Sequence, residues 1–148
     1  MDFIDLLLIH EPTGDVNEIY RAMETAYQDG KLRAIGISNF LESRYSDLIK
    51  HCKVIPAVNQ VETHVFRQQK NLQTLEAKKG TKHESWSSLA CGKNGIFTNQ
   101  TLMAIAQNHR KTVAQVALRF LTQQGIIIIP KSTHVERIEE NLKSLEPV

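Results

Sequence analysis

The sequence has few of the features that mark disulfide-rich, zinc-binding or membrane proteins. Its two cysteines, Cys52 and Cys91, lie far apart and form no C-x-x-C pair, so neither a disulfide framework nor a zinc site is indicated. The longest apolar run, residues 125–130, is too short to span a membrane. No basic segment followed by an apolar stretch marks a signal peptide at the N-terminus. We therefore expect two reduced thiols and a cytoplasmic location.

The sequence also lacks a concentration of charge of one sign. Its 18 basic and 16 acidic residues are spread along the chain and give a formal net charge of +2. Nucleic acid and anionic membranes need a clustered basic surface, so neither is an expected partner. No linker rich in proline or serine interrupts the 148 residues, of which 41% are hydrophobic. This composition is typical of a single globular domain spanning residues 1–148.

The sequence does contain a regular alternation of short apolar runs and amphipathic segments. Residues 3–9 form an apolar run that ends at His10-Glu11-Pro12, which is typical of a strand buried on both faces. Apolar residues then recur at helical spacing from Ile19 to Ala26, before Asp29-Gly30. The same alternation predicts further strands at 34–38, 56–61, 82–86 and 126–130, and helices at 41–51, 68–79, 100–109, 113–123 and 135–145.

Two of the predicted helix starts have the spacing of a capping box, Thr112-x-x-Gln115 and Thr133-x-x-Glu136. Alternating strands and helices predict an α/β fold with a parallel sheet and right-handed crossovers. Both an open doubly wound sheet and a barrel fit this pattern, and periodicity does not choose between them.

Polar residues interrupt the pattern at the C-terminal end of each predicted strand. In a parallel α/β fold these ends lie on one face, where ligands bind. Each residue taken alone also fits a turn, a helix cap or a packing position. The residues are His10, Ser38-Asn39, Gln60 with Glu62 and His64, Trp86-Ser87, and Lys131-Ser132.

Four segments resemble consecutive signatures of the aldo-keto reductases, in the order and at the spacing of that family. They are residues 5–12, 30–40, 56–64 and 129–132, and the resemblance covers essentially the whole chain. Residues 63–66 and 92–97 look most like the bacterial members that reduce small aldehydes and ketoacids. The resemblance implies a partial TIM (β/α) barrel, the C-terminal part of an NADP-binding domain, with about five parallel strands and outer helices.

The resemblance also implies an NADP(H) cofactor and a small carbonyl substrate. His10 matches the catalytic histidine, which donates a hydrogen bond to the substrate carbonyl. Ser38, Asn39 and Gln60 match the residues that bind the nicotinamide carboxamide, and Trp86 matches the aromatic residue that stacks on the nicotinamide ring.

The remaining matches concern the adenosine end of the cofactor. Ser87 and Leu89 fall in the loop that runs over the pyrophosphate. Lys131, Ser132 and Arg137 match the 2′-phosphate site, where a point charge, a hydroxyl and a guanidinium suit a dianion. The resemblance places Glu140 and Asn141 beside the adenine. On residue patterns alone, Arg137 and Glu140 are also explained by a solvated helix face with an i,i+3 ion pair.

The chain departs from the family pattern in two respects. The family's catalytic aspartate, tyrosine and lysine lie on the second and third strands, whereas this chain resembles the family from the fourth strand onward. Tyr20, Tyr27 and Tyr45 fall in predicted helices and do not replace the proton donor, whose loss costs about 10² to 10⁴ in rate. In addition, residues 81–89 are unusually polar for a barrel strand, so we expect this segment, and Trp86 with it, to be loosely held.

Two functions are therefore expected. One is an NADPH-dependent oxidoreductase, impaired in this truncated chain. The alternative is a non-catalytic NADP-binding fragment, or half of a split barrel that needs a partner chain. Five strands of a barrel leave open sheet edges and an inner face lined by residues such as Leu6 and Leu8, through which self-association or a completing partner is expected.

Overall fold

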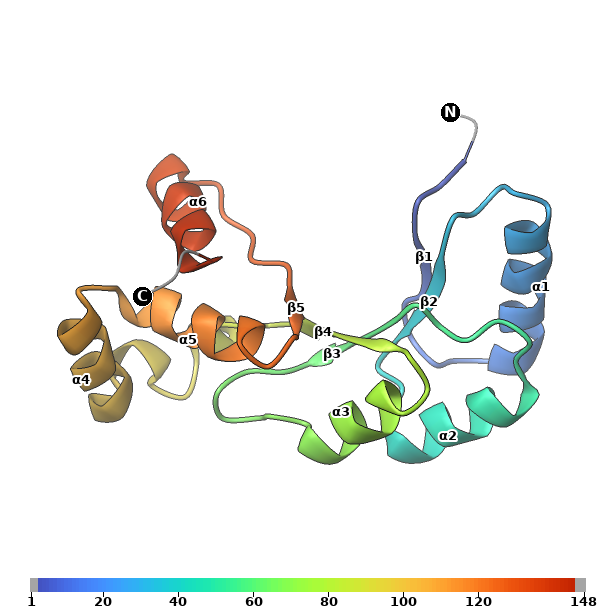
Figure 1. The fold of residues 1–148 in the computed structure, drawn as a ribbon, viewed down its shortest axis with the longest axis horizontal. Coiled ribbons are helices and arrows are strands. Elements are labelled where there is room, and N and C mark those ends of the chain that lie inside the picture. Colours follow the sequence, from blue (N-terminus) through green and yellow to red (C-terminus); the bar gives the residue numbers. More distant parts are fainter. Residues whose placement is uncertain (1–2, 146–148) are drawn as a thin grey trace. The chain divides into compact units, whose positions relative to one another are not determined.

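The computed structural model describes residues 3–145 and divides the chain into two compact units. Unit 1 contains the residues up to Val61 together with Gln69–His83, and unit 2 contains Glu62–Gln68 and the residues from Glu84 onward. Within the described residues, the strands alternate with helices and form a five-stranded sheet in the order β1-β2-β3-β4-β5 (Figure 1). Every described strand pairing is parallel, as the alternation predicts.

The elements follow the predicted order, with shorter strands than the sequence indicates. The strands are β1 (Leu7–Ile9), β2 (Ile35–Ser38), β3 (Val58–Glu62), β4 (Lys82–Trp86) and β5 (Ile127–Ile128). The helices are α1 (Val16–Gln28), α2 (Glu42–His51), α3 (Lys70–Ala77), α4 (Gln100–His109), α5 (Val113–Thr122) and α6 (Val135–Leu142). Short 3₁₀ turns lie at Ala90–Gly92, Ile96–Thr98 and Lys143–Leu145.

The register of β1, β2 and β3 depends on Gly36. Leu8 pairs with Gly36 across the first ladder, and Ser38 pairs with Gln60 across the second. A β-carbon at position 36 would lie 2.6 Å from Leu8 Cδ2 and 2.9 Å from the Val58 carbonyl oxygen, closer than atoms can pack. Only glycine therefore fits at this point of β2.

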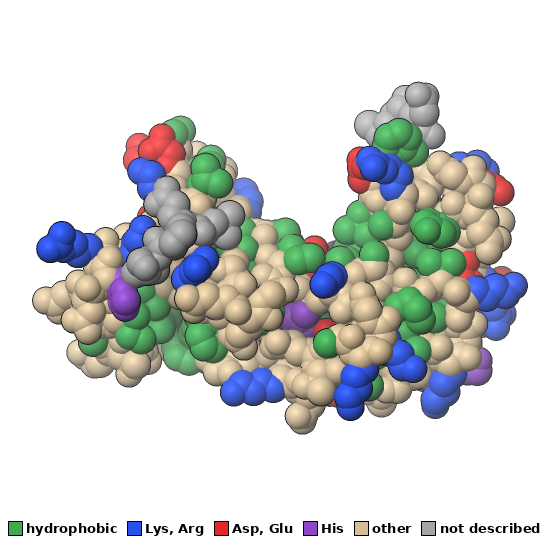
Figure 2. All heavy atoms as spheres, viewed as in Figure 1, with side chains coloured by type: hydrophobic (Ala, Val, Ile, Leu, Met, Phe, Trp, Pro, Cys, Tyr) green, Lys and Arg blue, Asp and Glu red, His purple; other side chains and the backbone are tan. Residues whose placement is uncertain are grey.

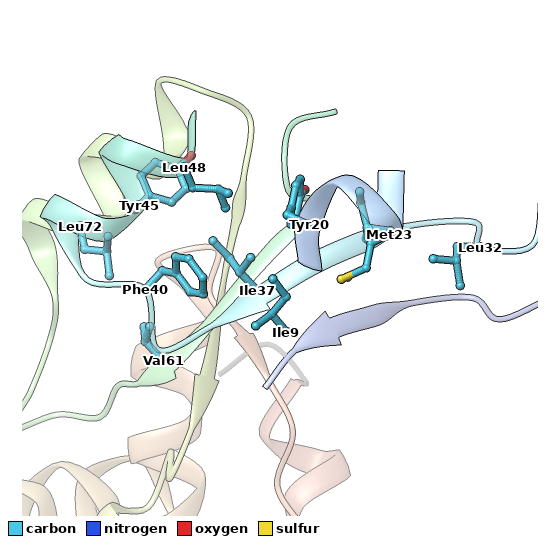
Figure 3. Packing of buried hydrophobic residues seen from close by; sticks show 11 residues of the cluster. Ile9, Tyr20, Met23, Leu32, Ile37, Phe40, Tyr45, Leu48, Val61 and Leu72 are labelled. Carbon is cyan, nitrogen blue, oxygen red and sulfur yellow. The ribbon is translucent and has the colours of Figure 1, made fainter. Parts of the chain in front are cut away.

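The core of unit 1 lies between the strands and helices α1 and α2. Tyr20 and Met23 of α1 pack toward the strands, and Tyr45 and Leu48 of α2 join the same cluster (Figure 3). The cluster contains 11 buried residues, which also include Ile37 of β2. Its amphipathic helices each turn one apolar face to the sheet, as in other parallel α/β folds.

The prediction that residues 3–9 are buried on both faces is wrong. Phe3, Ile4, Leu6 and Leu7 are exposed, and hydrophobic side chains reach the surface around the N-terminal segment (Figure 2). Only Ile9 of β1 belongs to the core cluster. The physical reason is that β1 is the first strand in the sheet order and pairs with β2 alone among the described residues.

One of the two predicted capping boxes forms. The Thr112 hydroxyl accepts from the Gln115 backbone N–H at 3.2 Å, and the Gln115 side chain accepts from the Thr112 N–H at 3.1 Å. Thr133 does not cap α6, so that prediction is wrong. The N-cap of α6 is His134, which makes no side-chain capping bond, and its own N–H donates to Ser132 Oγ at 3.1 Å.

The polar strand β4 is better anchored than its sequence predicts. His83, Glu84 and Ser85 are all buried. In unit 2, Ser85 Oγ donates to the Thr63 carbonyl at 2.6 Å and lies 2.8 Å from Ser88 Oγ. In unit 1, His83 Nδ1 lies 2.6 Å from Glu76 Oε2. The expectation of a loosely held strand therefore fails, because hydrogen bonds satisfy its buried polar groups.

No helix within residues 3–145 is both long enough and apolar enough to cross a membrane.

Candidate functional site

The candidate residues of unit 1 lie at the C-terminal ends of β1 and β2 and in β3. His10 directly follows β1 and is exposed. Ser38 ends β2 and stands opposite Gln60 of β3 in the ladder, so the fold brings these two together. Ser38 is only 1% exposed, and its Oγ has no hydrogen-bond partner within the described part of the chain. A buried hydroxyl without a partner is costly, which makes this atom a candidate to bind a polar ligand group.

Asn39 turns the chain immediately after β2. Its φ of 62° lies in the left-handed region, which asparagine tolerates better than most residues. Its backbone N–H donates to the Gln60 carbonyl at 2.9 Å, and its side-chain Nδ2 donates to Glu11 Oε1 at 2.8 Å. Sequence reasoning did not single out Glu11, although its place beside His10 after β1 was a usable signal.

Trp86 and Ser87 begin the candidate site of unit 2, at the end of β4. Trp86 is half-buried, and its carbonyl accepts from the Thr63 N–H at 3.2 Å. Ser87 has a φ of 57°, and its Oγ lies 3.0 Å from Cys91 Sγ. The chain therefore turns sharply directly after the aromatic residue.

A single cavity of unit 2 brings together six of the seven residues predicted for the adenosine end and its flanking loop, and Ser87 is not among its lining residues. Its volume is about 350 Å³. Phe97 and Ala114, which sequence reasoning missed, complete the lining; Phe97 lies in residues 92–97, and only the fold places it here. The predicted residues in the lining are Leu89, Lys131, Ser132, Arg137, Glu140 and Asn141.

The charged side chains that line this cavity are net positive, because Lys131 and Arg137 outnumber Glu140. Lys131 and Arg137 are exposed, and neither forms an ion pair within 4 Å among the described residues. No side chain caps the first turn of α6, so its amide groups and helix dipole add to the positive potential. Phosphate groups commonly bind to such a combination of cations and helix N-terminus.

Glu140 is held by α5 and its N-cap, not by Arg137. The Glu140 carboxylate accepts a hydrogen bond from the Thr112 hydroxyl, and its backbone carbonyl accepts from Gln115 Nε2 at 3.1 Å. The alternative i,i+3 ion pair between Arg137 and Glu140 is absent from the described residues. The Arg137 guanidinium is therefore left available to a ligand.

The tyrosines of unit 1 lie on helices, as expected. Tyr20 of α1 donates from its hydroxyl to the Val54 carbonyl at 3.0 Å, and Tyr45 of α2 shares a hydrogen bond of 2.8 Å with Thr81. Burial raises the pKa of both phenols. Tyr27 of α1 is exposed. The hydroxyls of Tyr20 and Tyr45 therefore form hydrogen bonds within unit 1.

Comparison with known proteins gives the family. The model of the aldo/keto reductase family matches residues 1–148. This chain belongs to that family. Over 142 residues it is 44% identical to glyoxal reductase of Bacillus subtilis (strain 168). The aligned residues make up 95% of this chain and 51% of that protein. The chain therefore spans about half the length of the curated relatives it matches.

Solved aldo-keto reductase structures have the same fold over this length. MGS-M4, an aldo-keto reductase from a Medee basin deep-sea metagenome library, superposes with a TM-score of 0.93 at 40% identity. A Gox0644 mutant in complex with NADPH gives a TM-score of 0.92 at 35% identity. Each comparison covers 99% of this aldo-keto reductase chain and 55% of the solved one. The fold is thus α/β, with five parallel strands and helices that form part of a TIM barrel.

Proposed function

We propose that residues 1–148 are the C-terminal, NADP(H)-binding part of an aldo-keto reductase domain, which reduces small aldehydes or ketones with NADPH. The observation that carries this proposal is the cavity of unit 2, where six residues chosen from the sequence line one space beside an uncapped helix N-terminus. A phosphorylated adenosine fits this combination of cations, hydroxyl and amide groups.

The adenosine 2′-phosphate would bind Lys131, Ser132 and Arg137. Arg137 is free of ion pairs within the described residues and can present two N–H groups to a phosphate. Glu140 and Asn141 would contact the adenine from the same cavity wall. NADH has no 2′-phosphate, so this site would prefer NADPH. Ser87 and Leu89 would lie along the pyrophosphate.

Four residues match the family's nicotinamide contacts. In unit 1 the unpartnered Ser38 hydroxyl, with Asn39 and Gln60, offers donors and acceptors to a planar carboxamide. Trp86 of unit 2 offers an indole face on which the nicotinamide ring would stack. When bound, NADPH would supply the hydride to the carbonyl carbon, and the family's tyrosine, which Tyr20, Tyr27 and Tyr45 do not replace, would supply the proton to the oxygen.

His10 would act on the substrate. It is exposed at the end of β1, and its imidazole N–H would donate a hydrogen bond to the carbonyl oxygen as negative charge develops there. A small carbonyl substrate is supported by the name of the Bacillus relative, glyoxal reductase.

The second candidate function is a non-catalytic NADP-binding fragment, or half of a split barrel that pairs with a completing chain or with itself. It is favoured by the exposed apolar side chains of Phe3, Ile4, Leu6 and Leu7 at and before β1. Steady NADPH oxidation with methylglyoxal, lost in His10→Ala, would favour the reductase, whereas cofactor binding without turnover would favour this alternative.

The phosphate site can be tested by titrating the chain with NADPH and with NADH while nicotinamide fluorescence is followed. We expect NADPH to bind about tenfold or more tightly, because a hydrogen bond to a charged group contributes about 1.5–3 kcal/mol. Arg137→Ala should remove most of this preference. Arg21→Ala replaces another exposed helix arginine and should leave both affinities unchanged. Equal affinity of the unmodified chain for the two cofactors would refute the assignment.

A further inference from the structure

Unit 1 buries a carboxylate that the proposed function does not use. Glu76 of α3 has no exposed surface. Its Oε1 accepts from Asn59 Nδ2 at 2.6 Å, and its Oε2 lies 2.6 Å from Nδ1 of His83, which is itself buried. Burying a carboxylate costs several kcal/mol even when it is paired, so core stability alone is a weak reason for its presence.

Glu76 determines the orientation of the Asn59 amide. The same Nδ2 atom donates its second hydrogen to the Phe40 carbonyl at 2.7 Å. Asn59 Oδ1 is buried and has no hydrogen-bond partner among the described residues. If the amide turned over, that oxygen would face two acceptors. The carboxylate and the carbonyl together therefore hold the amide in one orientation.

Asn59 connects this cluster to the candidate nicotinamide residues. Phe40 directly follows Ser38-Asn39, and Gln60 directly follows Asn59. The Asn39 N–H donates to the Gln60 carbonyl, which closes a ring of contacts between the end of β2 and β3. The Phe40 side chain is fully buried in the core cluster with Ile37 and Val61 (Figure 3). The left-handed turn at Asn39 is thus held from both sides, as strained turns at functional sites must be.

We propose that Glu76, supported by His83, is a positioning residue that holds Ser38, Asn39 and Gln60 in place through Asn59. The inference rests on the proposed function, in which these three residues bind the nicotinamide carboxamide. Glu76 itself touches no cofactor. Its loss should weaken binding of the nicotinamide end and spare the adenosine end, whose residues lie in unit 2.

The experiment compares two ligands, NADPH and adenosine 2′,5′-bisphosphate, which lacks the nicotinamide. In Glu76→Met, which keeps side-chain volume and removes the acceptor, NADPH should bind about tenfold more weakly, the equivalent of one hydrogen bond. Its affinity for the bisphosphate should stay within about twofold. Glu76→Gln keeps an oxygen for Asn59 and should recover most of the NADPH affinity.

Glu24 provides a matched control, because it is a second buried glutamate of unit 1. It accepts from the backbone N–H groups of Lys53 and Val54, and within the described residues it forms no hydrogen bond with Asn59 or Phe40. Glu24→Met should therefore leave both ligand affinities unchanged, even where it lowers the melting temperature. Circular dichroism establishes whether each variant folds. If Glu76→Met does not fold, Asn59→Ala replaces it, because this variant removes the amide and keeps the Glu76–His83 pair. Its affinities for NADPH and for the bisphosphate are then measured in the same way.

The outcomes separate this proposal from the proposed function. If the unmodified chain binds neither ligand, the proposed function fails. If it binds both, and the folded Glu76 variant either keeps its NADPH affinity or loses affinity for both ligands equally, Glu76 has a structural role only and the positioning proposal is overturned.

Discussion

At the scale of single residues, the two cysteines have different surroundings. Cys52 follows α2 and is half-buried, with its Sγ 3.9 Å from the Ile49 carbonyl. Burial raises the pKa of the Cys52 thiol, and the nearby Glu24 carboxylate raises it further. Cys91 is exposed on the 3₁₀ turn after Ser87. The sequence gives no sign of this difference.

We predict that iodoacetamide alkylates Cys52 several times more slowly than Cys91 at neutral pH. The thiolate is the reacting species, and a raised pKa leaves less thiolate at a given pH. Because the folded pKa is raised, the rate at Cys52 should climb as the pH is increased through the alkaline range. Peptide mass spectrometry over time measures both sites, with Cys52→Ser to confirm the assignment. Equal rates in the folded chain would contradict the expected burial.

At the scale of elements, two helix starts with the same motif behave differently. The pattern Thr-x-x-Gln/Glu occurs before α5 and before α6. Thr112 forms the full capping box, and its hydroxyl also donates to Glu140. At α6 the N-cap is His134, one residue later than the motif predicts. The same motif therefore forms a capping box at the start of α5 and not at the start of α6.

We predict that Thr112→Ala lowers the free energy of unfolding by about 1 kcal/mol, the usual cost of losing a side-chain N-cap. Thr133→Ala should change it by less than about 0.5 kcal/mol, the usual effect of surface substitutions without such a role. Urea unfolding followed by circular dichroism gives both values, and each variant serves as the other's control. Similar losses in both variants would mean that Thr133 caps α6 in solution.

At the scale of the whole molecule, the N-terminal segment exposes apolar side chains that can promote association. Leu7 of β1 and the preceding Phe3, Ile4 and Leu6 are exposed, and β1 pairs on one side only among the described residues. By contrast, lysine and arginine side chains are scattered over the visible face (Figure 2). Apolar surface beside a free strand edge favours association with another polypeptide.

We predict that the chain binds a hydrophobic fluorescent dye and sediments as a concentration-dependent mixture. Leu7→Lys should reduce both effects, because a lysine on an edge strand opposes strand pairing. Tyr27→Lys is a matched control, since Tyr27 and Leu7 are both 38% exposed and Tyr27 lies on α1. A stable monomer without dye binding, or equal effects of the two substitutions, would contradict a docking role for β1.

Much of the fold and of the candidate site could be predicted from the sequence. Hydrophobic periodicity depends on residues close together in the sequence, and it predicted the order of strands and helices. For β4 and α4 the predicted bounds are the observed ones. Lys131, Ser132 and Arg137 lie within seven residues of one another, so the start of one helix brings them to the same cavity. Their grouping follows from short-range chain geometry.

The tertiary structure decided the properties that depend on residues distant in the sequence. Glu76 is buried because Asn59 and His83 meet it, and nothing within its own helix indicates either partner. Phe97 joins the cavity of Lys131 and Arg137 across more than thirty residues of chain. Burial and hydrogen bonding depend on contacts between separate elements, whereas strand and helix periods depend on neighbours along the chain. For this reason the sequence by itself determined the order of the elements and the candidate residues, and only the folded chain determined which of them are buried, capped or exposed.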